Sequence, residues 1–571
     1  MGIYLNPGNE AFEESVNSEI YQDKSGLIAF TNKVLETEQK YLCVSRPRRF
    51  GKSMAAKMLA AYYDKSCNSH RLFENLQIAL DFSYEKQINK SSVLYLDISW
   101  FRTMAGNARQ VQTVLQREVI SELRTEYPEV IDKEVDSLPL ALANINQAEG
   151  EKFVVIIDEW DCLFREDRFD EKAQEEYIGF LRGLFKSAPA SKYIRLAYMT
   201  GILPVKKYGT QSALNNFKEF TMVNPGALSE YVGFTEMEVC DLCGRYHMEF
   251  EEAKHWYDGY YFSRVGSVYS PRSVVEAMLS REFGNYWTGT ETYEALKMYI
   301  DMDFDGLKDA VIGMLGGQRC KINPQKFQND MTGVRSRDDV MTLLIHLGYL
   351  AYDGKEQEAY IPNQEVADEF ENAMESSGWE EIARSLRASE ALLKATLQGD
   401  GEAVAQGLDS IHAANTSVLA YHNELSLSCA ITLAYYCARK DYTLIREMPA
   451  GKGFADIAFI PRKHSDKPAM VVELKWDTAA EGAISQIRSR EYAGALKEYA
   501  GEILLVGISY DKKDRKHKCR IESYFSRVGA ARCFCALFAQ KPETARAKMS
   551  AFCSFCVHHV ALNGEAVKSN N

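Results

Sequence analysis

Residues 41–53 read YLCVSRPRRFGKS: an apolar, strand-like run, a basic loop and a Gly-Lys-Ser tripeptide, followed at once by a helical pattern. The spacing is that of the phosphate-binding loop G-x-x-x-x-G-K-[ST], except that Arg46 occupies the position of the first glycine. Gly51 permits close backbone approach to a phosphate, Lys52 is placed to contact β- and γ-phosphates, and Ser53 is placed to ligate Mg²⁺. The stretch therefore predicts a nucleotide site at the amino end of a helix.

A second apolar strand, FVVIIDE over residues 153–159, ends in two carboxylates. Asp158 is placed to hold Mg²⁺, directly or through water, and Glu159 to act as general base on the attacking water. An ordinary buried strand with a solvated acidic end would look the same, but the phosphate loop upstream favours the catalytic interpretation. A third strand, Ile194–Thr200, ends in a hydroxyl that would hydrogen-bond the γ-phosphate or the lytic water, although many buried strands end in threonine.

Three arginines stand in the loop itself, at positions 46, 48 and 49. They are candidates for anion contacts, for arginine fingers toward a neighbouring subunit of a homo-oligomer, or for a solvated basic loop, and the sequence does not choose among these roles. The predicted set for binding ATP is Arg48, Arg49, Gly51, Lys52, Ser53, Asp158 and Thr200, with Ser53 and Asp158 as the Mg²⁺ ligands.

The chain of 571 residues is too long for a single core. Short apolar strands alternate with helical patterns over residues 1–225 and predict an α/β P-loop domain, a parallel sheet with helices on both faces. Residues 226–415 are expected to form a mainly helical lid or linker region, in which helix 338–347 and a following hairpin fit a winged-helix-like module or a plain lid equally well. Strands return over 416–522 and predict another α/β domain, and 523–571 are expected to form a helical extension.

The run FADIAF, residues 454–459, carries Asp456, and the run VVELK, residues 471–475, carries Glu473 and Lys475. Adjacent strands would bring the two carboxylates together, and Lys475 shares a face with Glu473 by the two-residue strand period. Two carboxylates and a backbone carbonyl can hold Mg²⁺ for phosphodiester hydrolysis, with Lys475 stabilising charge on the phosphate or positioning the nucleophile. The pattern is typical of PD-(D/E)xK nucleases with a restriction-endonuclease-like α/β fold, although a sheet with solvated edge charges would also show it.

The chain resembles the bacterial predicted AAA-ATPase-like proteins that carry a C-terminal PD-(D/E)xK nuclease-superfamily domain. The resemblance implies an AAA-like or STAND-like ATPase core, and in that family R-P-R-R-F-G-K-[ST] is the usual loop, which accounts for Arg46 in place of the first glycine. It extends over residues 10–522, and the matching segments are YQDK (21–24), RPRRFGKS (46–53), VVIIDE (154–159), MTG (199–201), WYDGY (256–260), YSP (269–271) and IPNQEV (361–366).

The same resemblance adds two residues to the predicted nuclease site. Glu424 lies on a helical stretch upstream, where the superfamily often places a further acid. Gln486 begins a Q-x(5)-Y element that ends at Tyr492, as in several branches of the superfamily. The predicted catalytic set is Glu159, Asp456, Glu473, Lys475, Glu424 and Gln486, with Asp456 and Glu473 as metal ligands.

Composition limits the partners and the compartment. A formal net charge of −13 argues against coating nucleic acid non-specifically, but leaves room for a local basic groove. Without a signal-peptide pattern or an apolar run of membrane length, we expect a cytoplasmic protein that has no membrane partner. The leading hypothesis is an ATP-regulated, Mg²⁺-dependent nuclease acting on DNA or RNA. The alternative is an ATP-dependent switch or scaffold whose nuclease fold binds nucleic acid or a partner without cutting, and a small-molecule kinase is a third class.

Overall fold

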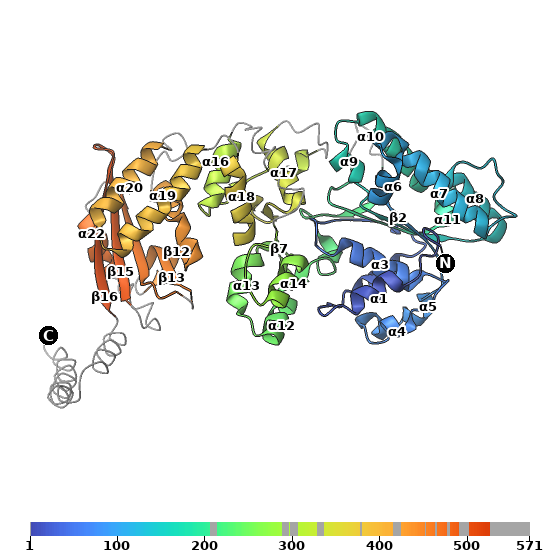
Figure 1. Cartoon of the computed structure of the whole chain (residues 1–571), viewed down its shortest axis with the longest axis horizontal. Helices are drawn as coiled ribbons and strands as arrows, with labels where there is room; N and C mark the ends of the chain where they lie inside the picture. Colours follow the sequence, from blue (N-terminus) through green and yellow to red (C-terminus); the bar gives the residue numbers. More distant parts are fainter. Residues whose placement is uncertain are drawn as a thin grey trace, which may run out of the picture. The chain divides into compact units, whose positions relative to one another are not determined.

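The structure, a computed structural model, describes residues 2–205, 214–287, 296, 306–327, 336–376, 380–414, 424–450, 453–462, 465–476, 480–489 and 502–525. The chain divides into two compact units, Met1–Trp379 and Glu380–Asn571 (Figure 1). The second unit begins at Glu380, ahead of the boundary that we expected after residue 415. The reason is packing, because helices α19 and α20 contact each other and α20 contacts strand β16 of the second unit's sheet.

The first unit is built on a five-stranded sheet with the order β2-β3-β4-β1-β5. Its pairings are parallel, as predicted. β1 and β3 are buried along their whole length, which is the composition that a parallel sheet with two covered faces requires. The strands are β1 Tyr41–Ser45, β2 Ser92–Asp97, β3 Phe153–Asp158, β4 Ile194–Gly201 and β5 Lys218–Phe220.

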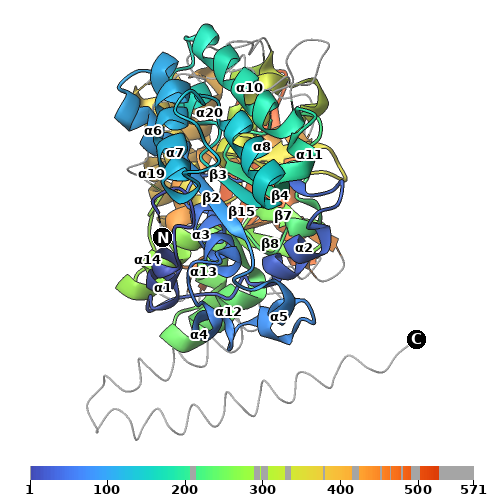
Figure 2. The same ribbon diagram turned by 90° about the vertical axis from the view of Figure 1, so that its right-hand side faces the viewer.

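Helices cover both faces of this sheet. α3 packs against β2, β3 and β4 on one face, while α6, α7, α8 and α10 lie on the other (Figures 1 and 2). The helices are α1 Glu10–Val16, α2 Gly26–Val34, α3 Lys52–Tyr63, α4 His70–Phe73, α5 Tyr84–Gln87, α6 Ile98–Ala105, α7 Val111–Glu126, α8 Leu138–Glu149, α9 Cys162–Glu166, α10 Glu171–Lys186 and α11 Ala190–Tyr193.

The remainder of the first unit is mainly helical, as expected, and holds two small sheets. One has the order β6-β8-β7 and shares a hydrophobic core with α12, α13 and α14. The other has the order β10-β11-β9, so the predicted hairpin exists and has a third strand paired to it. The elements are β6 Phe234–Thr235, α12 Glu236–Tyr246, α13 Phe250–Tyr257, β7 Tyr260–Phe262, β8 Gly266–Tyr269, α14 Pro271–Ser280, α16 Leu307–Leu315, β9 Cys320–Lys321, α17 Arg337–Leu347, β10 Ala351–Asp353, β11 Glu358–Tyr360 and α18 Gln364–Ser376.

The second unit is a five-stranded mixed sheet with the order β12-β13-β14-β15-β16. β14 and β15 are parallel, and α22 connects them in sequence and packs on both, whereas the other neighbours are antiparallel. Residues 523–525, which we expected to begin a helical extension, are the end of β16, and 526–571 lie outside the described residues. The elements are α19 Glu380–Leu397, α20 Gly401–Ala414, α21 Glu424–Ala434, β12 Tyr442–Ala450, β13 Gly453–Pro461, β14 Ala469–Trp476, α22 Ala480–Ser489, β15 Glu502–Asp511 and β16 Lys516–Phe525.

None of the described helices is both long enough and apolar enough to cross a bilayer.

Gly259 lies where two segments distant in the sequence meet. Its φ is +119°, a conformation that side chains rarely adopt, and a Cβ added there would stand 2.1 Å from the carbonyl oxygen of Pro362. The Tyr360 hydroxyl donates to the Gly259 carbonyl oxygen at 2.8 Å, which closes the contact. The glycine is therefore required by close backbone approach as well as by φ.

We expect Gly259→Ala to lower the thermal unfolding midpoint, because backbone strain at such a φ costs about 1–3 kcal/mol before the contact with Pro362 is counted. Gly244→Ala is the matched control. Gly244 lies within helix α12 with no heavy atom within 4 Å of an added Cβ, so alanine there should hold or raise the midpoint. Calorimetry of both variants measures the difference between their unfolding midpoints. Equal midpoints would contradict the requirement for glycine at position 259.

Candidate functional site

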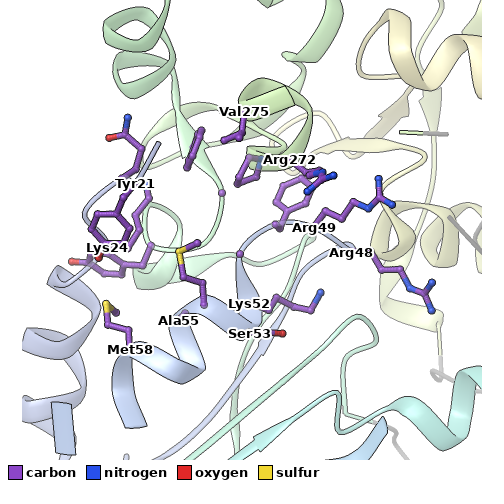
Figure 3. Close-up of a pocket in the computed structure, with 18 of the residues that line it drawn as sticks. Tyr21, Lys24, Arg48, Arg49, Lys52, Ser53, Ala55, Met58, Arg272 and Val275 are labelled. Atoms are coloured by element: carbon purple, nitrogen blue, oxygen red, sulfur yellow. The ribbon is translucent and has the colours of Figure 1, made fainter. Parts of the chain in front are cut away.

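A cavity of about 850 Å³ lies beside the phosphate loop in the first unit (Figure 3). Five members of the predicted nucleotide set line it, together with Glu159: Arg48, Arg49, Gly51, Lys52 and Ser53. Figure 3 shows its two ends, with Arg48, Arg49 and Arg272 toward one end and Tyr21, Lys24 and Met58 toward the other. The cavity thus has arginines at one end, while the other combines apolar side chains with Lys24, which is paired with Glu238.

The turn into α3 leaves room for an anion. Gly51 has a φ of +88°, and a Cβ added to it would meet no heavy atom within 4 Å. Gly51 is also the N-cap residue of α3 and has no side chain that could cap the helix, so the first backbone N–H groups can serve a phosphate. The Lys52 ammonium is buried and donates to the Pro47 carbonyl oxygen at 2.9 Å. Burial lowers its pKa, while the carboxylates of Glu159, Asp161 and Asp158 act in the opposite direction.

Ser53 and Asp158 come together at the end of β3. The Ser53 side chain and the Tyr95 hydroxyl both hydrogen-bond the Asp158 carboxylate, the latter at 3.1 Å. Burial is the largest influence on Asp158 and raises its pKa, against the lowering effect of Ser53 and Lys52. Asp158 is not in the cavity wall itself, but its bond to Ser53 gives the hydroxyl–carboxylate pair of oxygen donors that suits Mg²⁺.

Glu159 leaves the strand in a left-handed turn with a φ of +52° and lines the cavity. Burial raises the pKa of its carboxyl, and the cations of Lys52 and Arg165 oppose that effect. Arg165 forms an ion pair with Glu159 and a second one with Asp161, at 3.1 Å from Nε to the carboxylate. The predicted general base is therefore positioned at the wall of the cavity and is held there by an arginine.

Thr200 is not brought to this cavity. Its side chain is buried, and its hydroxyl has no hydrogen-bond partner among the described residues. Its carbonyl oxygen accepts from the Trp160 backbone N–H at 3.0 Å, because β4 runs beside the turn that follows β3. Thr200 is therefore not among the residues that form the cavity wall with Lys52 and Glu159.

Arg46 takes none of the roles considered from the sequence. It is fully buried, and its guanidinium donates to the carbonyl oxygens of Ser45 and Phe220 at 2.9 and 3.0 Å. Its charge lies 5.1 Å from the ring centre of Phe262, and burial lowers its pKa to about 10. Burial together with Arg46 lowers the pKa of His346 to about 3. Arg46, which occupies the position of the first glycine, therefore stabilises the phosphate loop through its contacts with Ser45, Phe220 and Phe262.

The sequence did not identify the residues at the far end of the cavity, around Tyr21 and Met58, nor the lining arginines Arg165 and Arg272. The segment at positions 21–24 borders the cavity, and Lys24 is engaged by Glu238 at 2.7 Å. The YQDK segment was one of those that match the family, but the sequence pattern did not show that it lies beside the phosphate loop. The lining residues outside the predicted set include Phe12, Ile20, Tyr21, Gln22, Lys24, Met54, Met58, Arg165, Tyr231, Phe234, Arg272 and Val275.

A second cluster lies on the sheet of the other unit. β13 and β14 pair up to Ile457 and Val472, so Asp456 and Glu473 stand opposite each other at the next position. The Asp456 carboxylate accepts from the Leu474 backbone N–H at 2.7 Å. Glu473 is buried and accepts from Lys475 at 3.3 Å and from the amide of Gln486 on α22. Asp456, Glu473, Lys475 and Gln486 are therefore brought together as the sequence predicted.

One expected member of that cluster, Glu424, has no described side chain. Glu424 is the first residue of α21, but its side chain lies outside the described part of the chain, as does Tyr492 of the Q-x(5)-Y element. No group of three or more His, Cys, Asp or Glu residues with metal-site geometry occurs among the described residues. A metal at this cluster would be held by the Asp456–Glu473 pair and a backbone oxygen, and that donor set fits Mg²⁺.

Two known families match this chain, one in each of its two units. Residues 8–210 match the family described as predicted AAA-ATPase, and residues 428–519 match the PD-(D/E)XK nuclease superfamily. The chain joins an AAA-ATPase-like domain to a PD-(D/E)XK domain. The first match contains the phosphate loop and the end of β3, and the second contains Asp456, Glu473, Lys475 and Gln486.

Individual relatives are more distant. Over 288 residues the chain is 27% identical to an uncharacterized protein in the vnfD 5′ region of Azotobacter chroococcum mcd 1. The match covers 48% of this chain and 51% of the relative, so the chain spans about half the length of that curated protein. The structure of the Aeropyrum pernix ORC2 protein, in ADPNP–ADP complexes, matches over 63% of this chain and 97% of its own length. At 12% identity and a TM-score of 0.30, that likeness is too weak to relate the two proteins closely.

The contrast between Arg46 and Arg48 can be tested directly. We expect Arg46→Ala to lower the thermal unfolding midpoint, because it removes a buried side chain and leaves two carbonyl oxygens without this donor, at about 1–3 kcal/mol each. Arg48→Ala should leave the midpoint nearly unchanged and weaken binding of a fluorescent ATP analogue. The reverse pattern, with Arg46→Ala stable but unable to bind nucleotide, would contradict the supporting role of Arg46.

Proposed function

We propose that this protein binds and hydrolyses ATP with Mg²⁺, and that its C-terminal domain is a Mg²⁺-dependent nuclease on DNA or RNA whose activity ATP regulates. The observation that carries the proposal is that one chain brings together the central side chains of both sites. Lys52 and Glu159 line one cavity, and Asp456, Glu473 and Lys475 converge on adjacent strands of the other unit.

The ATP part rests on how each group in the cavity would act on a triphosphate. Lys52 and the N–H groups at the start of α3 would bind the phosphates, and Ser53 with Asp158 would hold the Mg²⁺. Glu159 would orient and deprotonate the attacking water, a task that requires a carboxylate in the cavity wall. The apolar end, with Tyr21 and Met58, offers rings and side chains against which a base can pack.

The nuclease part rests on the carboxylate pair and its neighbours. Bound Mg²⁺ would polarise the scissile phosphate and lower the pKa of a bound water. Asp456 and Glu473 are the residues that would hold it, and the Gln486 amide orients the Glu473 carboxylate. Lys475, which is partly exposed beside Glu473, would stabilise the negative charge that develops on the phosphate.

The setting we propose is the cytoplasm, with nucleic acid as the partner. Cys43, Cys162 and Cys243 are buried free thiols, which supports a reducing compartment. A net charge of −13 makes non-specific coating of DNA or RNA unfavourable, so contact should be confined to the region around Lys475.

For ATP hydrolysis, we expect Lys52→Ala to weaken nucleotide binding at least about tenfold, since it removes the cation that faces the phosphates. Glu159→Gln should preserve binding and lower kcat by about 10²–10⁴-fold, because the amide cannot accept the proton. Phosphate release and equilibrium binding, measured on the same preparations, separate the two effects. Full turnover in Glu159→Gln would remove Glu159 as the base.

For cleavage, purified protein with Mg²⁺ should cut at least one of a panel of single- and double-stranded DNA and RNA substrates. Asp456→Ala and Lys475→Ala should each lose this activity by at least about 10²-fold, because the metal and the phosphate charge lose their partners. Lys516→Ala, an exposed lysine on β16 of the same sheet, is the control and should cut normally. Cleavage that survives both site variants would place the activity elsewhere.

The regulatory part has its own readout in the same assay. Cleavage rates with ATP, with ADP and without nucleotide should differ in the native protein and become equal in Lys52→Ala. If ATP is hydrolysed and nucleic acid is bound while no substrate is cut, the protein is instead an ATP-dependent switch whose nuclease fold serves as a binding module.

A further inference from the structure

Arg165 is a buried cation in the nucleotide cavity to which the proposed chemistry gives no task. It lies on α9 and lines the cavity, and only 9% of its side chain is exposed. One terminal nitrogen pairs with the Glu159 carboxylate, and Nε pairs with the Asp161 carboxylate at 3.1 Å. The guanidinium therefore connects the predicted general base to a second carboxylate that is completely buried.

Asp161 is itself fixed to the backbone of the segment that follows β4. One of its carboxylate oxygens accepts from the N–H groups of Ile202 and Leu203 at 3.1 and 2.8 Å, as well as from Arg165. Gly201 allows this approach, because a Cβ added there would stand 2.5 Å from the other Asp161 oxygen. The anchor of Arg165 is thus fixed by Gly201 at the end of β4 and by the two residues that follow it.

The balance of charge argues against Arg165 acting on a phosphate directly. A guanidinium that contributes to phosphate binding must keep positive charge for the anion, as an arginine finger does. Here a single cation lies between two carboxylates, Glu159 and Asp161, which together outweigh it. The cavity wall also contains other cations, Lys52 and the arginines at its basic end.

We propose that Arg165 is a positioning residue for ATP hydrolysis: anchored on Asp161, it holds the Glu159 carboxylate at the cavity wall in the orientation that activates water. Glu159 emerges from a left-handed turn with a φ of +52° and bears a long side chain, so its carboxylate needs an external support to keep one orientation. Misplacement of a reacting group by about 1 Å can cost on the order of 100-fold in rate. This inference rests on the proposed function, because it requires Glu159 to be the base.

The test compares Arg165→Gln, Arg165→Lys and Glu159→Gln with the double variant Arg165→Gln/Glu159→Gln. We expect Arg165→Gln to lower kcat by about 10–100-fold, while the affinity for a fluorescent ATP analogue changes by less than about threefold. Arg165→Lys should recover part of the rate, because it returns a cation to the space between the carboxylates. In single-turnover measurements the double variant should be no slower than Glu159→Gln, since Arg165 acts only through Glu159.

The controls separate this role from folding. Asp161→Asn weakens the anchor and should reproduce the kcat loss with affinity preserved. Arg102→Gln breaks a comparable pair with Asp167, which lies outside the cavity wall, and should leave kcat unchanged. If Arg165→Gln does not fold, as judged by its thermal transition, Arg165→Lys and Asp161→Asn decide the matter through kcat and affinity alone.

Three results would overturn the proposal. Additive losses in the double variant would show that Arg165 contacts the phosphate itself. An unchanged kcat in Arg165→Gln would remove the positioning role, and a raised kcat would show that Arg165 restrains Glu159. Failure of the underlying function looks different, because Glu159→Gln would then hydrolyse ATP normally whatever residue occupies position 165.

Discussion

The first sheet is covered by helices on both faces, and this burial decides where its chemistry can be. β1 and β3 are inaccessible along their length, so a polar side chain within them would have to be satisfied inside the sheet. The strands can present charged groups only where they end. Because parallel strands end at one edge, the loop after β1 and the turn after β3 emerge at the same edge of the sheet, on either side of β4. Lys52 and Glu159, far apart in the sequence, share one cavity for this reason.

Burial also explains why the phosphate loop departs from the common glycine form. Arg46 places a cation behind the loop, bonded to the Phe220 carbonyl oxygen of β5 and lying over the ring of Phe262 of β7. The next residues make further contacts with the helical part of the unit. Arg49 donates to the Tyr286 carbonyl oxygen at 3.2 Å, and the rings of Phe50 and Tyr260 are 5.4 Å apart. Side-chain contacts with the middle region therefore hold the phosphate loop in place. A glycine at position 46 would be flexible and would make no such contact.

The second unit obtains its site by a different route. Its sheet is mixed, and the antiparallel pairing of β13 and β14 sets Asp456 opposite Glu473. The crossover helix α22 between the parallel strands β14 and β15 then adds Gln486 to the same cluster. Two strands and one helix, all local in sequence, are enough to assemble this cluster, whereas the nucleotide cavity draws on segments spread between Phe12 and Val275.

The sequence alone determined the features that depend on local pattern. Apolar runs that contain charged residues or border on them identified β1, β3, β13 and β14, and strand period placed Glu473 and Lys475 on one face. It could not determine what surrounds each side chain, because burial is set by residues far away in the chain. Arg46 was a candidate for an anion contact, an arginine finger or a solvated loop, yet it is buried, bonded to the Phe220 carbonyl oxygen and close to the ring of Phe262. Thr200 lies near the end of β4, but its buried side chain is not among those that line the cavity. The contact of Arg165 with Glu159 was likewise decided by tertiary structure, because it depends on the left-handed turn at Glu159 and on the backbone N–H groups that anchor Asp161.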